Sequence, residues 1–206
     1  MIDQKKFEER IREADFIITD LIREKKIITS FTELEKIKFT KFYQKQANLS
    51  LIAADVLYKI STQKLSKEFH KLNPDYECFL WVINPSYYCM FYSVHALLAY
   101  KGIRISQEQG IHKKTAHALV YFCVKNDFIA KELYEQFMES QQEAAELLNV
   151  EEFKEKAENL AGNYFYELEK RSRFTYETEE EAKERHAATS LKRAKEFLAE
   201  IEKIIM

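Results

Sequence analysis

The sequence predicts an all-α protein, an antiparallel up-and-down helical bundle with an N-terminal helical extension. Only 3 glycines and 2 prolines occur among 206 residues, far below the usual share of roughly 7% and 5%. A β-sandwich or a doubly wound sheet needs frequent tight turns made by these residues, so both folds are excluded. Apolar residues make up 46% of the chain and charged residues 32%, which is enough to build a core. We expect an extension over residues 1–44 and a bundle over residues 45–206.

Helical periodicity of the apolar residues begins close to the N-terminus, over about residues 3–26. A second, long helix is expected over about residues 32–60, with Ser30 and Thr32 as candidate N-caps. Its length is compatible with a break near residues 48–50. Its predicted buried stripe consists of Leu34, Ile37, Phe42, Ala47, Leu51, Ala54 and Leu57.

Pro85 favours the start of a new helix over about residues 85–101, with Asn84 as its N-cap and Gly102 just past its end. This helix is ringed by Tyr87, Tyr88, Met90, Phe91, Val94, Leu97, Leu98 and Tyr100. A helix that is apolar on all sides is expected in the middle of a bundle. We therefore interpret these aromatic residues, and His95 among them, as core residues. Further helices are expected over 113–126, 130–148, 150–170 and 179–205, with a loop at 103–111 and a break at 171–178.

The cysteines Cys78, Cys89 and Cys123 are odd in number and are not spaced like metal ligands. They favour buried free thiols in a reducing cytoplasm, and neither a disulfide framework nor a metal site is expected. The first residues are charged, and no run of eighteen apolar residues occurs. We therefore expect no signal peptide, no contact with a membrane and a cytoplasmic location. With three glycines, a glycine-rich phosphate loop is excluded, and no cofactor is predicted.

Four segments, residues 47–54, 87–102, 168–176 and 179–205, together resemble the HEPN family (higher eukaryotes and prokaryotes nucleotide-binding domain) in order and spacing. The second contains a Tyr87-Tyr88 pair and ends in Lys101-Gly102, and the third is an arginine-rich stretch that ends in Tyr176. The resemblance implies a helical bundle that commonly forms a homodimer. It also implies either ribonuclease activity or nucleotide binding beside a minimal nucleotidyltransferase in a toxin–antitoxin pair.

The ribonucleases of this family carry an arginine followed, after four to six residues, by a histidine. No Arg and His in this chain have that spacing, and the nearest pair, Arg104 and His112, has seven residues between. At the matching segment Arg171 is followed, after four residues, by Tyr176. The imidazole that would act as a general base is therefore missing there, and no catalytic residue is assigned.

Arg171, Arg173 and Tyr176 are the predicted nucleotide- or RNA-binding residues. Two guanidinium groups can each grip a phosphate through paired hydrogen bonds, and a phenol ring can stack on a base. The alternative is that the arginines pair with nearby glutamates while the tyrosine packs at a helix joint. The first hypothesis is thus a HEPN-like nucleotide- or RNA-binding module. The alternatives are a structural helical interaction protein and a HEPN ribonuclease with a displaced site that uses Arg104, His112 or His186.

Overall fold

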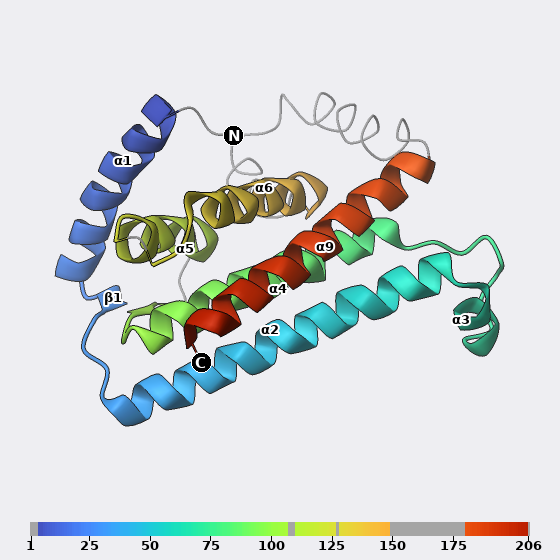
Figure 1. The fold of residues 1–206 in the computed structure, drawn as a ribbon, viewed down its shortest axis with the longest axis horizontal. Coiled ribbons are helices and arrows are strands. Elements are labelled where there is room, and N and C mark those ends of the chain that lie inside the picture. The colour runs from blue at the N-terminus through green and yellow to red at the C-terminus, as the bar shows by residue number, and fades with distance from the viewer. Residues whose placement is uncertain (1–3, 107–109, 127, 149–179, 206) are drawn as a thin grey trace, which may run out of the picture.

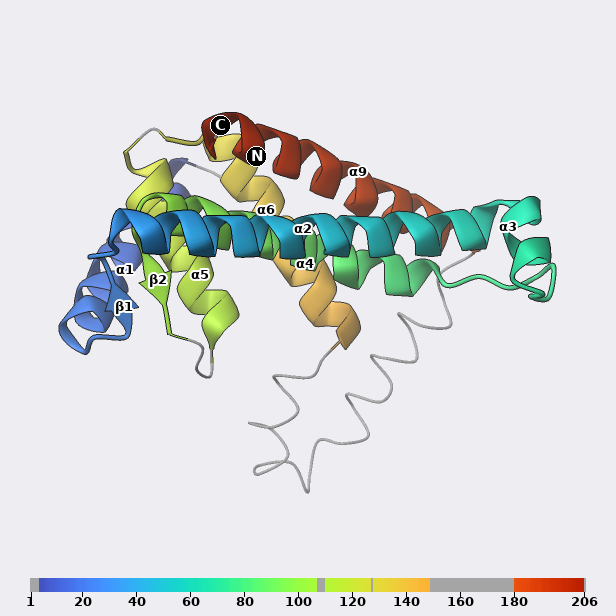
Figure 2. The same ribbon diagram turned by 90° about the horizontal axis from the view of Figure 1, so that it is seen from below.

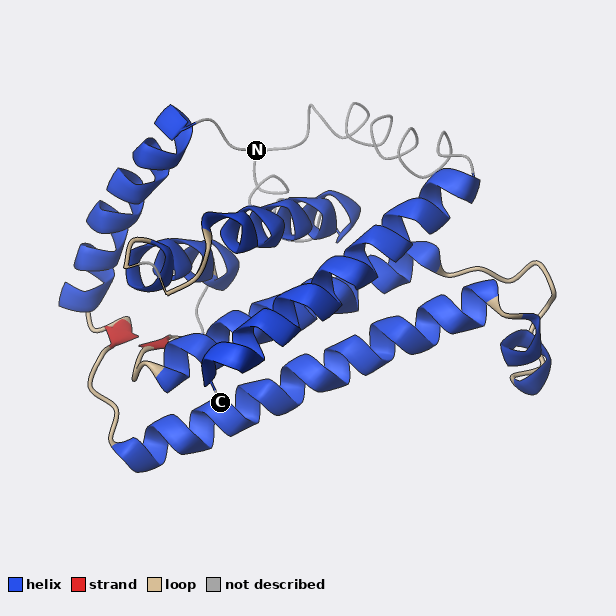
Figure 3. Cartoon of the chain, in the orientation of Figure 1, coloured by secondary structure: helices blue, strands red, loops and turns tan. Residues whose placement is uncertain are grey.

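The computed structural model confirms an all-α helical bundle, and it describes residues 4–106, 110–126, 128–148 and 180–205 (Figure 3). None of the described helices is long and apolar enough to cross a membrane. The elements, in chain order, are α1 (Gln4–Arg23), β1 (Ile27–Ile28), α2 (Glu33–Thr62), α3 (Lys64–Phe69), α4 (Phe79–Tyr100), β2 (Arg104–Ile105), α5 (Ile111–Leu119), a π-helical turn (Val120–Val124), α6 (Lys131–Leu148) and α9 (Glu180–Ile205).

Three long helices, α2, α4 and α9, lie side by side, with α4 in the middle of the molecule and α2 at its edge (Figures 1 and 2). α4 and α9 run in the same direction, and α2 runs antiparallel to both. α6 crosses α4 and α9, while α1 and α5 lie at one end. The main core joins side chains from α1, α4, α5, α6 and α9 around buried residues such as Met90, Leu97, Phe137 and Phe197. The expected central position of the apolar helix is thereby confirmed. Tyr100, in its last turn, is 46% exposed, so the prediction that it belongs to the core was wrong.

α2 begins with a capping box, in which the Thr32 backbone N–H donates to Glu35 Oε2 and the Glu35 N–H donates to Thr32 Oγ1. Thr32 is therefore the N-cap, as expected from the sequence. The helix continues unbroken to Thr62, so no break occurs near residues 48–50. The boundary expected between residues 44 and 45 falls inside this helix, and a division into two units stays a prediction.

The predicted buried stripe of α2 was partly wrong. Ala47 and Ala54 are fully buried, whereas Leu34, Ile37 and Phe42 are exposed. Small side chains on the inner face let α2 lie close to α4, because an alanine adds little width between two helix axes. The larger apolar side chains are left on the outer face.

α4 begins at Phe79, six residues before the expected start, and Pro85 lies inside it. The proline occupies the second turn, where its missing N–H deprives only the carbonyl of Trp81 of its helical bond. Trp81 is exposed, so water can hydrogen-bond that carbonyl. Asn84 is consequently not an N-cap, and its buried Oδ1 has no hydrogen-bond partner among the described residues.

Helices α1, α3 and α4 end in the same backbone motif. Lys25, Lys71 and Gly102 follow their last turns in the left-handed region, with φ of 58°, 54° and 80°. At α4, the Gly102 N–H donates to the Ala99 carbonyl and the Ile103 N–H to the Leu98 carbonyl. This Schellman pairing satisfies two carbonyls that the helix end would leave bare. The expected role of Gly102 is confirmed.

α3 lies on an excursion of the chain between α2 and α4 (Figure 1). None of its residues is buried. The two ends of the excursion meet at Ser61 and Cys78, where the Cys78 N–H donates to Ser61 Oγ over 2.9 Å. The Ser61 hydroxyl also lies 3.1 Å from Cys78 Sγ. This contact joins the end of α2 to the start of α4.

Two expected segments take a different form in the structure. The helix expected over 113–126 is α5 followed by a π-helical turn, so its backbone accommodates one extra residue. The loop expected at 103–111 contains β2, which pairs antiparallel with β1 through Ile27 opposite Ile105. The expected helix over 150–170 and the break at 171–178 lie outside the described residues.

Candidate functional site

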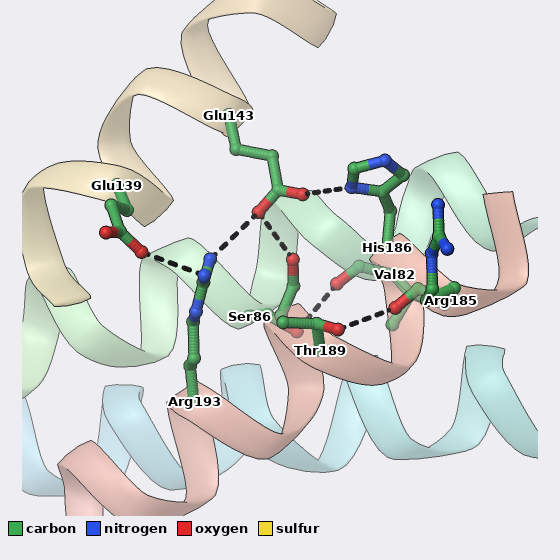
Figure 4. Close-up of polar contacts among 9 residues, drawn as sticks. Val82, Ser86, Glu139, Glu143, Arg185, His186, Thr189 and Arg193 are labelled. Atoms are coloured by element: carbon green, nitrogen blue, oxygen red, sulfur yellow. Dashed lines mark hydrogen bonds and ion pairs between the residues drawn. The ribbon is translucent and has the colours of Figure 1, made fainter. Parts of the chain in front are cut away.

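The predicted binding residues Arg171, Arg173 and Tyr176 lie outside the described residues, in the segment that precedes α9. The described part of the chain instead presents a polar cluster between α6 and α9. Its centre is Glu143 of α6, which faces His186 and Arg193 of α9 (Figure 4). Ser190 of α9 also contacts this carboxylate.

Both carboxylate oxygens of Glu143 are engaged. The Ser190 hydroxyl donates to Oε2 over 2.7 Å, and His186 Nδ1 donates to Oε1 over 3.2 Å. Arg193 lies 3.8 Å from Oε2 of Glu143 and 2.8 Å from Oε2 of Glu139. These contacts hold the carboxylate of Glu143 in one orientation toward α9.

Helical spacing explains why these side chains meet. His186, Ser190 and Arg193 are four and three residues apart on α9, so they share one face. Glu139 and Glu143 are one turn apart on α6, and both lie on the side of α6 that points toward α9. The helices are held together beneath this polar layer by apolar side chains such as Phe137 and Phe197, whose rings lie 6.2 Å apart.

The cluster extends from the buried interior to the solvent-exposed surface. Ser190 is buried, the Glu143 side chain is 15% exposed, and the His186 side chain is 48% exposed. Because Glu143 accepts from Nδ1, the imidazole of His186 carries its proton on that nitrogen when neutral. Nε2 then keeps a lone pair that can accept a proton.

Arg185 stands beside His186 on α9 and is exposed. Its guanidinium forms no ion pair with any described residue, in contrast to that of Arg193. Its backbone carbonyl accepts a hydrogen bond from the hydroxyl of Thr189 (Figure 4). Arg185 and His186 are consecutive residues of α9, and both are exposed near its start.

The other residues of the expected displaced site have separate partners. His112 Nδ1 lies 2.7 Å from the hydroxyl of Tyr87, and its ring packs beside Phe91. Arg104 stacks over the ring of Phe39, with 4.9 Å between its guanidinium carbon and the ring centre. His112 is thus a structural member of the aromatic core, and Arg104 is held against α2.

His95 is a hydrogen-bonded core histidine, as expected. Its Nε2 lies 3.0 Å from Thr115 Oγ1, and the Thr115 hydroxyl donates to the carbonyl of Ile111. The hydroxyl must therefore accept from His95, which places the proton on Nε2. Burial, and to a lesser degree the nearby His112, lowers the pKa of His95 to about 3, so the ring is neutral at pH 7.

Sequence reasoning did not single out Glu143, because the chain has 34 acidic residues and many are spread along helices. The sequence feature that could have indicated the cluster is the i, i+4 pair Glu139 and Glu143, together with a histidine and an arginine seven residues apart on α9.

Among the described residues, no three histidine, cysteine or acidic side chains converge as they would around a metal ion. No protein-family model matches the chain, and no curated protein or solved structure matches it either.

Proposed function

We propose that the protein is a HEPN-like module that binds a nucleotide or an RNA end through the start of α9. The proposed binding residues are Arg185 and His186, together with Arg171, Arg173 and Tyr176 from the sequence prediction. The observation that carries the proposal is that Glu143 holds the ring of exposed His186, while the exposed guanidinium of the preceding residue, Arg185, has no ion pair among the described residues. The resemblance to the HEPN family extends the proposal to a homodimer and to a nucleotidyltransferase partner in a toxin–antitoxin pair.

A phosphate suits this pair of side chains. The guanidinium of Arg185 presents a planar fork of donors that matches two phosphate oxygens. Protonated His186 adds an N–H donor from Nε2. The negative charge of Glu143 does not oppose the phosphate strongly, because Ser190, His186 and Arg193 already surround it.

The proposal is tested by fluorescence anisotropy with a labelled short single-stranded RNA and with a fluorescent ATP derivative. Arg185→Ala and the double variant Arg171→Ala/Arg173→Ala are each expected to weaken binding by tenfold or more. Each lost phosphate contact should also make the dependence of log affinity on log salt shallower by about 0.7. The control is Arg23→Ala, which removes an exposed arginine at the end of α1.

Undetectable binding of both probes by the wild-type protein would contradict the proposal. Equal affinities of the wild type and the Arg185 and Arg171/Arg173 variants would contradict it as well. Equal losses in the Arg23 variant would show that only the overall charge matters.

A second candidate function is metal-independent cleavage of RNA with His186 as the general base. The observation that favours it is the Glu143–His186 hydrogen bond, which orients the ring and leaves Nε2 able to take the proton of a 2′-hydroxyl. Arg185 would then balance the charge that develops on the phosphate.

This candidate is tested by incubating RNA with the protein in EDTA. His186→Ala is expected to slow cleavage by about 10²–10⁴-fold. Glu143→Gln is expected to slow it less, because it disturbs the orientation of the ring and leaves the ring in place. Absence of cleavage at high protein concentration removes the candidate.

A further inference from the structure

The outer face of α2 carries six large apolar side chains that are at least 45% exposed. They are Leu34, Ile37, Phe42, Leu49, Ile52 and Val56. At 3.6 residues per turn they fall on one side of the helix, and we call this surface the α2 stripe. It is about 33 Å long, at 1.5 Å per residue.

The α2 stripe has no cover within the described structure. α2 lies at the edge of the bundle, and no described element lies against its outer side (Figures 1 and 2). Its inner side packs against the rest of the bundle, and Ala47 and Ala54 on that side are completely buried. A row of exposed large apolar side chains of this length on one helix face is typical of an interaction surface.

The charges on the α2 stripe are of one sign. Lys38, Lys41 and Lys45 are exposed and make no ion pair with any described residue. No acidic residue occurs between Glu35 and Asp55. By contrast, Lys36 pairs with Glu33, and Lys59 pairs with Asp55. Three cations among apolar side chains, without carboxylates of their own, indicate that the missing carboxylates come from the occupant.

These charges argue against two other occupants. A second copy of the chain would bring the same lysines to the interface, and its Asp55 is already bound by Lys59 and Lys195. A lipid surface favours helices whose lysines flank the apolar face, where the ammonium groups reach the headgroups. Here helical spacing puts Lys38, Lys41 and Lys45 along the midline of the stripe.

We propose that the α2 stripe docks an acidic amphipathic helix of a partner protein. Apolar side chains of that helix would pack on Phe42, Leu49 and Ile52, and its carboxylates would pair with Lys41 and Lys45. This interface is separate from the phosphate-binding face proposed at the start of α9, and it goes beyond that function. Removing the stripe should leave nucleotide and RNA binding unchanged.

The test uses the full-length protein and a synthetic helical peptide of about 22 residues, with leucine at the a and d positions and glutamate at the flanking positions. Binding of the labelled peptide to the wild type is expected and should weaken as salt is raised. Ile52→Ser and Lys41→Glu/Lys45→Glu are each expected to reduce the affinity by at least tenfold. The matched controls are Leu65→Ser and Lys64→Glu on exposed α3, which should bind as the wild type does.

Three other results overturn the proposal. The first is failure of the peptide to bind the wild type, or equal binding by the stripe variants. The second is dimerisation in sedimentation velocity that Ile52→Ser abolishes, which would assign the stripe to a second copy. The third is co-sedimentation with phosphatidylserine vesicles that the same variants lose, which would assign it to a lipid surface. Circular dichroism spectra of all variants establish that they are folded.

Discussion

Lowering the pH from 7 to 5 is predicted to destabilise the protein through His95. The folded protein holds this ring neutral, with a pKa of about 3, whereas the unfolded chain protonates it near 6.5. Between these two values the unfolded state binds more protons, so the free energy of unfolding falls as the pH falls. The stability that the neutral His95 ring contributes is present above the unfolded-state pKa of about 6.5 and is lost progressively as the pH falls below that value.

The magnitude follows from the two pKa values. At pH 5 the preferential protonation of the unfolded chain removes about 2 kcal/mol from the free energy of unfolding. The partly buried ring of His117 acts in the same direction, because burial also lowers its pKa. Its imidazole lies near Glu13 and Lys113, whose charges have opposite effects on it. Between pH 7 and pH 5, the free energy of unfolding of the whole protein should therefore fall by at least the contribution of His95.

Urea unfolding at pH 7 and pH 5, followed by circular dichroism, measures this loss. His95→Gln keeps a side-chain donor for Thr115 but has no ring to protonate. It is expected to be less stable at pH 7, yet to lose about 2 kcal/mol less than the wild type between the two pH values. His70→Gln, at an exposed histidine, should behave as the wild type does. An unchanged pH dependence in His95→Gln would refute the reasoning.

Two further predictions concern a helix end and the buried thiols. Lys25→Gly is expected to raise the free energy of unfolding by about 0.5–1 kcal/mol, because Lys25 holds φ of 58° and glycine adopts this conformation without strain. Thermal melting should show a rise of about 1–4 °C, and a decrease would contradict this account. Burial raises the pKa of the thiols of Cys89 and Cys123 to about 12, so neither should react with Ellman's reagent in the native protein at pH 8. Both should react in urea, and rapid native labelling of either would contradict their burial.

The parts of the fold that could be predicted from the sequence depend on local chemistry. Thr32 starts α2 because its hydroxyl and Glu35 satisfy backbone donors within four residues of each other. Gly102 ends α4 because a left-handed residue closes the last turn. Such signals lie within one turn of the helix end that they determine, so a single sequence contains them.

The predictions that were wrong, the start of α4 and the buried face of α2, depend on packing between helices. Pro85 is compatible with the first position of a helix, but the apolar run from Phe79 extends α4 by packing against Ala54, Ala187 and Leu191. On α2, hydropathy assigned Leu34 and Phe42 to the core, whereas the close approach to α4 selects alanines. The size of a side chain, and not its hydropathy alone, determines which face of a helix lies inward.

The candidate site was harder to predict than the fold. Glu143 and His186 are 43 residues apart in the sequence, and their contact depends on how α6 crosses α9. A single sequence does not fix a crossing angle, so His186 was considered without its carboxylate partner. The segment that carries Arg171, Arg173 and Tyr176 lies outside the described residues, and its role stays a prediction.

The contact between Ser61 and Cys78 has a consequence for what this chain tolerates. Because it holds the ends of α2 and α4 together, the stretch between them is anchored at both ends and contributes no buried side chain from α3. We therefore expect a reporter domain inserted after Phe69 to leave the packing of the bundle unchanged. Natural insertions and engineered ones should be tolerated at this same position.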